Sequence, residues 1–205
     1  NDKSVHSINE MKKNLPYEGV TSFLATSGAE PISDIVEGIK NVSYVLNTQK
    51  DDGATCIGVH LEGPFINKDF KGMQREECCI DPSLDIMHEF MDAQGSDNVI
   101  KLMTIAPELP NAKEVIKYCN DHQIQLNIGH SAATFECISE LKEYGLGGVT
   151  HMFSGMKGLH HRELGVAGSA MYYDDLTCEF AKQTGMTVKP EAFALIWKLK
   201  SKDKI

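Results

Sequence analysis

Short apolar runs alternate with segments of helical periodicity about six times along the chain, at intervals of roughly 20 to 40 residues. This alternation constrains the fold more than any other feature, because repeated strand–helix–strand units form a parallel sheet with right-handed crossovers. Two architectures satisfy that rule: a (β/α)8 barrel and an open, doubly wound sheet. No low-complexity linker or shift in composition divides the sequence, so we expect residues 1–205 to form a single domain.

The elements expected from these patterns can be stated as residue ranges. Strands are expected at 19–25, 55–62, 99–105, 124–128, 147–153 and 176–181, of which the first is expected to be buried and the last is the weakest. Helices are expected at 7–15, 32–46, 82–93, 111–121, 135–144 and 191–199, with Asn111 as an N-cap. A long polar loop is expected at 67–81.

The stretch from Gly58 to Phe65 combines strand character with polar chemistry. A β-branched, apolar run leads to His60 and Glu62, whose side chains point to the same face of an extended chain. A Gly-Pro pair then ends the strand. A carboxylate at the end of a buried strand is costly unless a cation or hydrogen bonds meet it. Glu62 is therefore either an acid in a salt bridge at a loop mouth or part of a functional site.

Two later strands also end at a histidine. His130 follows the apolar run at 124–128, and His151 lies in the run at 147–153. Either histidine alone would more often be a buried structural residue. One glutamate and two histidines from three strand ends suit Zn²⁺, with a coordination position left for water. Iron, cobalt and manganese are alternatives for the single divalent ion. Ligands at the carboxyl ends of several strands favour the barrel over the doubly wound sheet.

Composition and charge exclude several classes of partner. The formal net charge is −9, which argues against nucleic acid because phosphate backbones attract basic surfaces. No apolar run approaches the ~18 residues that a membrane span needs, so no membrane partner is expected. The six cysteines form no C-x-x-C pair or regular framework, and we expect reduced thiols and a cytoplasmic location.

Four motifs make the sequence similar to a known family. HLEGPF at 60–65, GHSAAT at 129–134, THMF at 150–153 and LHHRELG at 159–165 closely resemble segments of N-acetylglucosamine-6-phosphate deacetylases, which are metal-dependent amidohydrolases. The resemblance covers nearly the whole chain and implies a (β/α)8 barrel of the amidohydrolase type. With 205 residues the chain is short for such a barrel, which takes about 250.

The resemblance also implies what this sequence does not include. We expect a first barrel strand upstream of Glu18 and a last strand beyond Ile205, so that residues 1–205 form a partial barrel without the family's small β domain. The family's general base and acid is an aspartate at the end of that last strand. We therefore expect no residue within this chain to fill its role, and Asp203 precedes the strand.

The resemblance assigns Glu62, His130 and His151 as metal ligands and Arg162 as the residue that grips the sugar phosphate, from the neighbouring subunit in dimeric members. The metal would polarise the acetamide carbonyl and lower the pKa of its bound water. A planar guanidinium suits bidentate contact with phosphate. The alternative for Arg162 is an exposed side chain that pairs with Glu163.

Other substrate contacts implied by the resemblance depart from the usual family sequence. Ser154 and Gly155 stand where the family has Asn-Ala, and Met73 falls where a backbone group contacts the sugar. Thr187 occupies the place of a substrate-binding histidine, and Thr184 that of an aspartate. These departures leave the metal ligands intact but weaken the case for the usual substrate.

The leading hypothesis is a metal-dependent hydrolase that converts N-acetylglucosamine 6-phosphate into glucosamine 6-phosphate and acetate, in amino-sugar catabolism. Its partners would be a small phosphorylated amino sugar and a second copy of the chain in a homodimer. One alternative is a divergent amidohydrolase that acts on another small amide. The other is a non-catalytic protein that binds metal or sugar phosphate without turnover.

Overall fold

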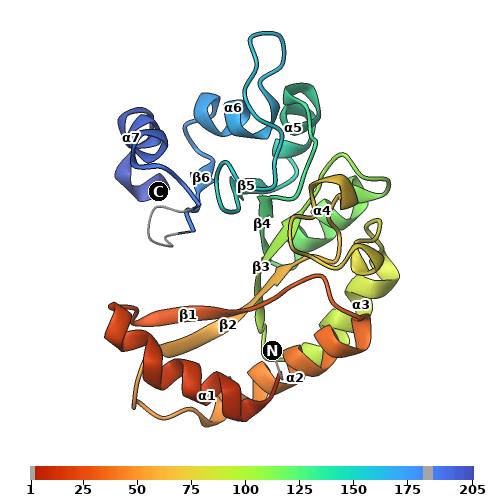
Figure 1. Cartoon of the computed structure of the whole chain (residues 1–205). Coiled ribbons are helices and arrows are strands. Elements are labelled where there is room, and N and C mark those ends of the chain that lie inside the picture. Colours follow the sequence, from red (N-terminus) through yellow and green to blue (C-terminus); the bar gives the residue numbers. More distant parts are fainter. Residues whose placement is uncertain (1–2, 182–186) are drawn as a thin grey trace.

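The computed structural model describes residues 3–181 and 187–205 as a curved sheet covered by helices (Figure 1). The sheet has six strands in the order of the chain, each parallel to the next. They are β1 (Ser22–Ser27), β2 (Thr55–Glu62), β3 (Ile100–Ile105), β4 (Gln125–Ile128), β5 (Leu146–Val149) and β6 (Thr177–Cys178). The sheet curls into half of a barrel, which confirms the partial (β/α)8 architecture expected from the sequence.

Most of the helices connect successive strands and lie on the outer side of the curl (Figure 1). The helices are α1 (Val5–Asn14), α2 (Ile32–Thr48), α3 (Leu84–Gln94), α4 (Ala112–Asp121), α5 (Phe135–Lys142), α6 (Gly165–Tyr172) and α7 (Pro190–Leu199). Short 3-10 helices occur at Leu15–Glu18, Lys68–Phe70, Glu76–Cys78 and Lys202–Lys204. The segment expected as a polar loop at 67–81 thus contains two single turns of 3-10 helix.

The core forms where the helices pack on the sheet. Ile35, Ile39 and Val42 of α2 recur at helical spacing and are each at most 3% exposed. Leu61 of β2 pairs with Met103 of β3, and both are fully buried in the same cluster. Burial of such a side chain contributes about 1.5–3 kcal/mol. Because strand residues alternate between faces, the residues on either side of Leu61 and Met103 in the sequence line the inside of the curl.

Three strand predictions need correction. The first strand lies at 22–27 rather than 19–25, and none of its residues is buried, because among the described strands β1 pairs only with β2. The strand expected at 147–153 ends at Val149, since His151 and Phe153 have φ angles of 34° and 77°, outside the extended region. The strand expected at 176–181 is reduced to Thr177–Cys178.

One helix escaped prediction altogether. Helix α6 has the sequence GVAGSAMY, and six of its eight residues are buried. Periodicity reveals a helix that has one polar face, so a short helix that is apolar on all sides gives no such signal. It begins at Gly165, the last residue of the LHHRELG motif, and the rest of the helix follows that motif.

The capping prediction for Asn111 is wrong in its mechanism. Asn111 does precede α4, but its backbone is left-handed, with φ of 63°, and its side chain makes no capping hydrogen bond. Its Nδ2 donates instead to the carbonyl of Pro82 at 3.4 Å. The helix expected at 82–93 begins at Leu84, because Ser83 accepts a hydrogen bond from the Ile86 N–H and so caps it.

A buried glutamine fixes the start of β3 and gives a first testable prediction. Gln94 at the end of α3 is 5% exposed, and its Oε1 accepts from the N–H groups of Val99 (2.8 Å) and Ile100 (2.9 Å). Gln94→Leu would leave both buried donors unsatisfied, so the free energy of unfolding in urea should fall by about 2 kcal/mol. Glu89→Leu on the exposed side of the same helix is the control and should change it by less than about 0.5 kcal/mol.

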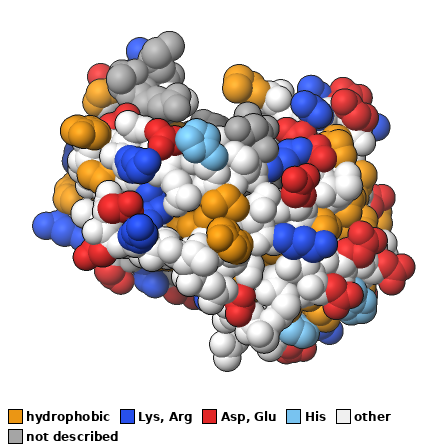
Figure 2. Space-filling model, turned by 90° about the horizontal axis from the view of Figure 1, so that it is seen from below, with side chains coloured by type: hydrophobic (Ala, Val, Ile, Leu, Met, Phe, Trp, Pro, Cys, Tyr) orange, Lys and Arg blue, Asp and Glu red, His pale blue; other side chains and the backbone are white. Residues whose placement is uncertain are grey.

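The surface carries both signs of charge. The face in Figure 2 shows acidic and basic side chains interspersed, with apolar side chains in small groups. In the part of the chain that the structure describes, no helix is both long and apolar enough to cross a membrane.

Candidate metal centre

The carboxyl ends of β2, β4 and β5 meet at one edge of the sheet. Glu62 is the last residue of β2, and His130 and His151 each lie two residues beyond the ends of β4 and β5. Glu62 pairs with Thr104 of β3, which pairs in turn with Asn127 of β4. Asn127 pairs with Gly148 of β5. Because the strands are parallel and these pairs align their ends, the three strand ends lie at the same level, and their side chains can converge.

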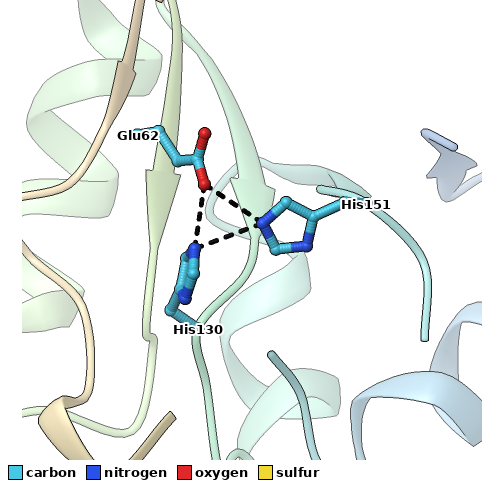
Figure 3. Close-up of side chains that lie close together, drawn as sticks. All are labelled: Glu62, His130 and His151. Carbon is cyan, nitrogen blue, oxygen red and sulfur yellow. Dashed lines mark hydrogen bonds and ion pairs between the residues drawn. The ribbon is translucent and has the colours of Figure 1, made fainter. Parts of the chain in front are cut away.

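Figure 3 shows that they do converge. Oε1 of Glu62 lies 2.9 Å from Nε2 of His130 and 3.2 Å from Nε2 of His151, and the two Nε2 atoms are 3.2 Å apart. His130 is buried, whereas Glu62 and His151 are partly buried. The structure thus brings together the three residues that the sequence analysis proposed as metal ligands, and their ligand atoms all lie within 4.8 Å of one another.

Backbone carbonyls set the orientation of both imidazole rings. Nδ1 of His130 lies 2.8 Å from the carbonyl oxygen of Phe70, and Nδ1 of His151 lies 3.0 Å from that of Ser154. A carbonyl only accepts, so each Nδ1 must carry the proton that it donates. In a neutral ring, Nε2 then carries a lone pair, which is directed at the other two ligand candidates. Such contacts on the far nitrogen are typical of histidines that bind metal.

The backbone at both histidines is left-handed. His130 has φ of 47° and His151 has φ of 34°, which few residues other than glycine adopt. At His130 this conformation is held by the N–H of Asn67, which donates to the His130 carbonyl at 2.9 Å. Non-glycine residues in this region persist only where the surroundings hold them, and they concentrate at functional sites.

The donor set fits a divalent ion. A tetrahedral zinc site with bonds of about 2.0–2.1 Å separates its ligand atoms by about 3.3–3.4 Å. The separations between Oε1 of Glu62 and the Nε2 atoms of His130 and His151 are 2.9 to 3.2 Å, close to that value. Three lone-pair groups at such distances repel one another unless a cation lies among them. The residues present therefore match the metal that the sequence motifs imply.

The charges of Glu62, His130 and His151 also favour a cation between these three side chains. Burial alone would raise the pKa of Glu62. When no cation lies among the three groups, however, the imidazoles of His130 and His151 can present an Nε2–H to its carboxylate, and these contacts outweigh burial and hold that pKa well below the usual range. Burial would lower the pKa of His151, yet the hydrogen bond and charge of Glu62 raise it. A carboxylate that stays ionised beside two imidazoles is what a divalent ligand set requires.

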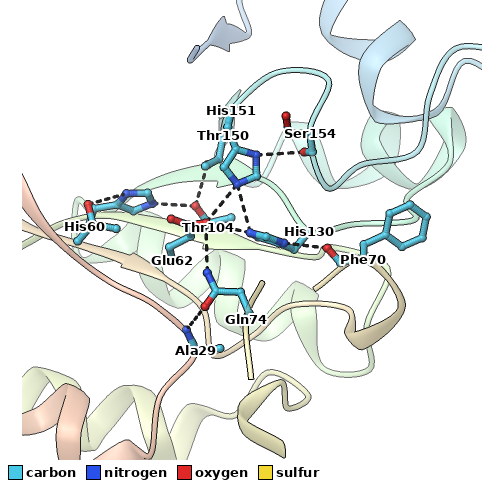
Figure 4. Close-up of polar contacts among 11 residues, drawn as sticks. Ala29, His60, Glu62, Phe70, Gln74, Thr104, His130, Thr150, His151 and Ser154 are labelled. Carbon is cyan, nitrogen blue, oxygen red and sulfur yellow. Dashed lines mark hydrogen bonds and ion pairs between the residues drawn. The ribbon is translucent and has the colours of Figure 1, made fainter. Parts of the chain in front are cut away.

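Gln74 ties Glu62 to the end of β1 (Figure 4). Its Nε2 donates to Oε1 of Glu62 at 3.3 Å, and its Oε1 accepts from the N–H of Ala29 at 2.8 Å. A Cβ atom on Gly28 would lie 2.6 Å from that same Oε1, so a side chain there would displace the Gln74 amide. Gln74 therefore limits the positions that the Glu62 carboxylate can take.

A buried polar network lies beside the three ligands on the inner face of the sheet (Figure 4). Nε2 of His60 lies 2.7 Å from Oγ1 of Thr104, which lies 2.7 Å from Oγ1 of Thr150. Burial lowers the pKa of His60 to about 4, so its ring is neutral near pH 7. His60 thus shares the inner face with Glu62, as strand alternation predicts, but its ring is engaged with threonine hydroxyls.

Ser154 and Gly155, predicted to contact substrate, lie next to the two histidines. The Ser154 carbonyl orients His151, and a Cβ atom on Gly155 would lie 3.1 Å from Nδ1 of His130. Gly155 also has φ of 57°, so a side chain there would be strained as well as crowded. Met73 precedes Gln74 in the loop after β2, and its side chain is fully exposed.

The other predicted substrate contacts lie on the surface. Arg162 is exposed, and Oγ1 of Thr187 donates to the carbonyl of Ala181 at 2.7 Å. Within residues 3–181 and 187–205, neither bonds to the three ligand candidates. The alternative in which Arg162 pairs with Glu163 is not observed, because the Glu163 carboxylate accepts from backbone N–H groups instead. Thr184 lies outside the described residues.

Sequence reasoning missed two side chains that shape this site. Glu108 follows β3 and contacts the loop that carries His130, while Gln74 contacts Glu62. The signal for Glu108 was present, since it is a carboxylate directly after a buried strand, as Glu62 is. No comparable signal marks Gln74, because it lies within a polar loop.

Comparison with known proteins agrees with the fold. No protein-family model matches the chain. The N-acetylglucosamine-6-phosphate deacetylase of Bacillus subtilis (strain 168) is 30% identical over 206 residues, which cover 100% of this chain and 51% of that protein. A solved structure of the deacetylase from Thermotoga maritima is 32% identical, with a TM-score of 0.85 over 96% of this chain and 52% of that one. The structure from Pasteurella multocida is 27% identical, with a TM-score of 0.89 over 99% and 51%.

These matches extend from one end of the chain to the other and include the three strand ends that carry Glu62, His130 and His151. The chain spans about half the length of the curated relatives it matches. By sequence and by fold, this chain is a relative of the N-acetylglucosamine-6-phosphate deacetylases and corresponds to about half of such a protein.

Proposed function

We propose that the protein to which this chain belongs is a metal-dependent deacetylase that hydrolyses N-acetylglucosamine 6-phosphate to glucosamine 6-phosphate and acetate. The observation that carries the proposal is the convergence of Glu62, His130 and His151, with 2.9 to 3.2 Å between their ligand atoms. The relatives named as deacetylases of this substrate add support. All six cysteines are free, which suits a reducing compartment such as the cytoplasm.

In this proposal, Glu62, His130 and His151 hold one divalent ion, with zinc preferred and iron, cobalt or manganese as alternatives. When bound, such an ion supplies Lewis acidity that polarises an amide carbonyl and makes a water molecule nucleophilic near neutral pH. The chain's own contribution is orientation. Phe70 fixes one ring through its carbonyl, and Gln74 restrains the carboxylate.

The sugar phosphate would be held by residues around this centre. Ser154 and Gly155 lie beside the histidines, and we propose that they contact the sugar together with the backbone of Met73 and with Thr187. Arg162 would bind the phosphate of a substrate in the neighbouring subunit of a homodimer. Its exposure supports a role across an interface, because an exposed guanidinium is available to another chain.

Metal removal tests the proposal. Dialysis of the purified protein against a chelator should abolish release of acetate from N-acetylglucosamine 6-phosphate, and one equivalent of Zn²⁺ should restore it. The reason is that no other electrophile is expected to activate the amide. Elemental analysis should find one divalent ion per chain. Activity that survives complete removal of metal would contradict the proposal.

A second candidate function is hydrolysis of another small amide. The observation that favours it is at Thr187, whose hydroxyl donates to the Ala181 carbonyl, at the position where the family resemblance implies a histidine. Ser154 also offers less reach than the asparagine it replaces. A panel of N-acetylglucosamine 6-phosphate, N-acetylglucosamine and short N-acetyl amides distinguishes the two. Stoichiometric metal without turnover of any of them would favour the non-catalytic alternative.

A further inference from the structure

Glu108 lies in the loop after β3 and joins two other strand-end loops. Its Oε2 accepts from the hydroxyl of Ser131 at 2.7 Å. Its Oε1 accepts from the N–H of Ala132 at 2.6 Å and from Nδ2 of Asn67 at 2.9 Å. Ser131 and Ala132 follow His130 directly, and Asn67 belongs to the loop after β2. One carboxylate therefore receives three hydrogen bonds from the two segments that surround His130.

The same contacts lead to the backbone of His130 itself. The N–H of Asn67 donates to the His130 carbonyl at 2.9 Å, so Asn67 is bonded to both Glu108 and His130. Ser131 is bonded further, because its N–H donates to the carbonyl of Gly155 and its carbonyl accepts from the N–H of Lys157. The residue next to His130 thus connects the loops after β3, β4 and β5.

An ionised carboxylate is suited to this position because it only accepts, and three donors face it. Hydrogen bonds to a charged acceptor are roughly twice as strong as neutral ones. The hydroxyl of Ser131 also accepts from the N–H of Ala133 at 3.0 Å, which directs its own proton towards Glu108. His130, with φ of 47°, is in a conformation that persists only where the surrounding structure holds it.

We propose that Glu108 is a positioning residue that holds the loop after β4 so that Nε2 of His130 faces Glu62 and His151. Its effect on metal affinity rests on the proposed metal centre, whereas its effect on the His130 ring does not. Outer contacts of this kind typically change metal affinity by about 10–100-fold when they are removed.

The test compares two carboxylates that accept similar side-chain hydrogen bonds, one beyond each end of β3. Asp97 precedes β3 and accepts from Ser43 Oγ at 2.7 Å and from Asn47 Nδ2 at 2.8 Å. It therefore matches Glu108 in its serine and asparagine donors but lies far along the strand direction from the metal centre. Glu108→Ala should raise the dissociation constant for Zn²⁺ by about 10–100-fold, whereas Asp97→Ala should leave it within about twofold.

A second readout needs no metal. In the metal-free protein, the proton on Nδ1 of His130, which is donated to the Phe70 carbonyl, should give a protected imidazole resonance in NMR. That resonance should be lost in Glu108→Ala and kept in Asp97→Ala. Glu108→Gln, which keeps the shape and one acceptor oxygen, should give intermediate values of both readouts.

The outcomes separate this proposal from the proposed function. If the wild-type protein binds no metal, the proposed function fails, and the His130 resonance alone decides the role of Glu108. If Glu108→Ala and Asp97→Ala have the same affinity and the same resonance, Glu108 is a structural contact only and the proposal is overturned. Should Glu108→Ala not fold, the pair Glu108→Gln and Asp97→Asn decides in the same way.

Discussion

Replacement of His130 by alanine is expected to abolish both stoichiometric metal binding and amide hydrolysis. His130 contributes one of three ligand atoms, and its Nε2 lies 2.9 Å from Oε1 of Glu62 and 3.2 Å from Nε2 of His151. Loss of a direct ligand should weaken metal binding by more than the roughly 100-fold that the loss of an outer contact can cause. Elemental analysis after gel filtration and a competition titration with a chromophoric chelator measure the effect.

The control is an exposed histidine that lies outside the site. His6 on α1 is exposed, so His6→Ala should keep metal content and activity at the wild-type level. Thermal unfolding of metal-free samples checks that His130→Ala still folds. If His130→Ala retains one tightly bound metal ion per chain, or if the wild-type protein takes up none under any loading condition, the assigned site is wrong.

The three ligand candidates could be found from the sequence because each lies at a strand end. A run of β-branched residues locates the strand, and the parallel order then brings Glu62, His130 and His151 to one edge. This reasoning needs only local patterns and the handedness of the connections. It therefore predicts the convergence of these side chains without any knowledge of loop conformation.

The contacts that orient those ligands could not be found in the same way. The carbonyl of Phe70 and the side chain of Gln74 come from the segment after β2, whose path depends on turns and on packing against other loops. Gly28 matters only because Gln74 approaches it, which is a relation across 46 positions of sequence that no periodicity records. Helix α6 was missed for a related reason, since burial on all sides removes the polar face on which helix detection depends.

Substitution of Arg162 is expected to reduce kcat/KM for the phosphorylated substrate by ~30-fold or more, which corresponds to ~2 kcal/mol. Arg162 lies in the segment 157–165, where His160 and Glu163 form an antiparallel bridge, and it is exposed. Among the described residues the Arg162 guanidinium has no ion pair, so its charge is available for a ligand. Removal of a charged hydrogen bond to phosphate costs substrate binding and transition-state stabilisation together. Steady-state kinetics of Arg162→Ala with N-acetylglucosamine 6-phosphate measure the loss.

The decisive comparison for Arg162 is between two substrates rather than between two proteins. With unphosphorylated N-acetylglucosamine, Arg162→Ala should lose far less of its kcat/KM, because that substrate never makes the phosphate contact. Lys40→Ala, which removes one exposed positive charge from α2, controls for the change in net charge and should affect neither substrate. Equal losses for both substrates would show that Arg162 supports the structure of the segment 157–165 instead of binding phosphate.

A loss confined to the phosphorylated substrate requires that this exposed guanidinium reach a bound phosphate. Mixing the Arg162→Ala and His130→Ala variants then tests whether the arginine comes from the same subunit as the metal centre or from its partner. If Arg162 acts across a dimer, mixed dimers combine one intact metal centre with one intact arginine and should recover activity that neither variant has alone.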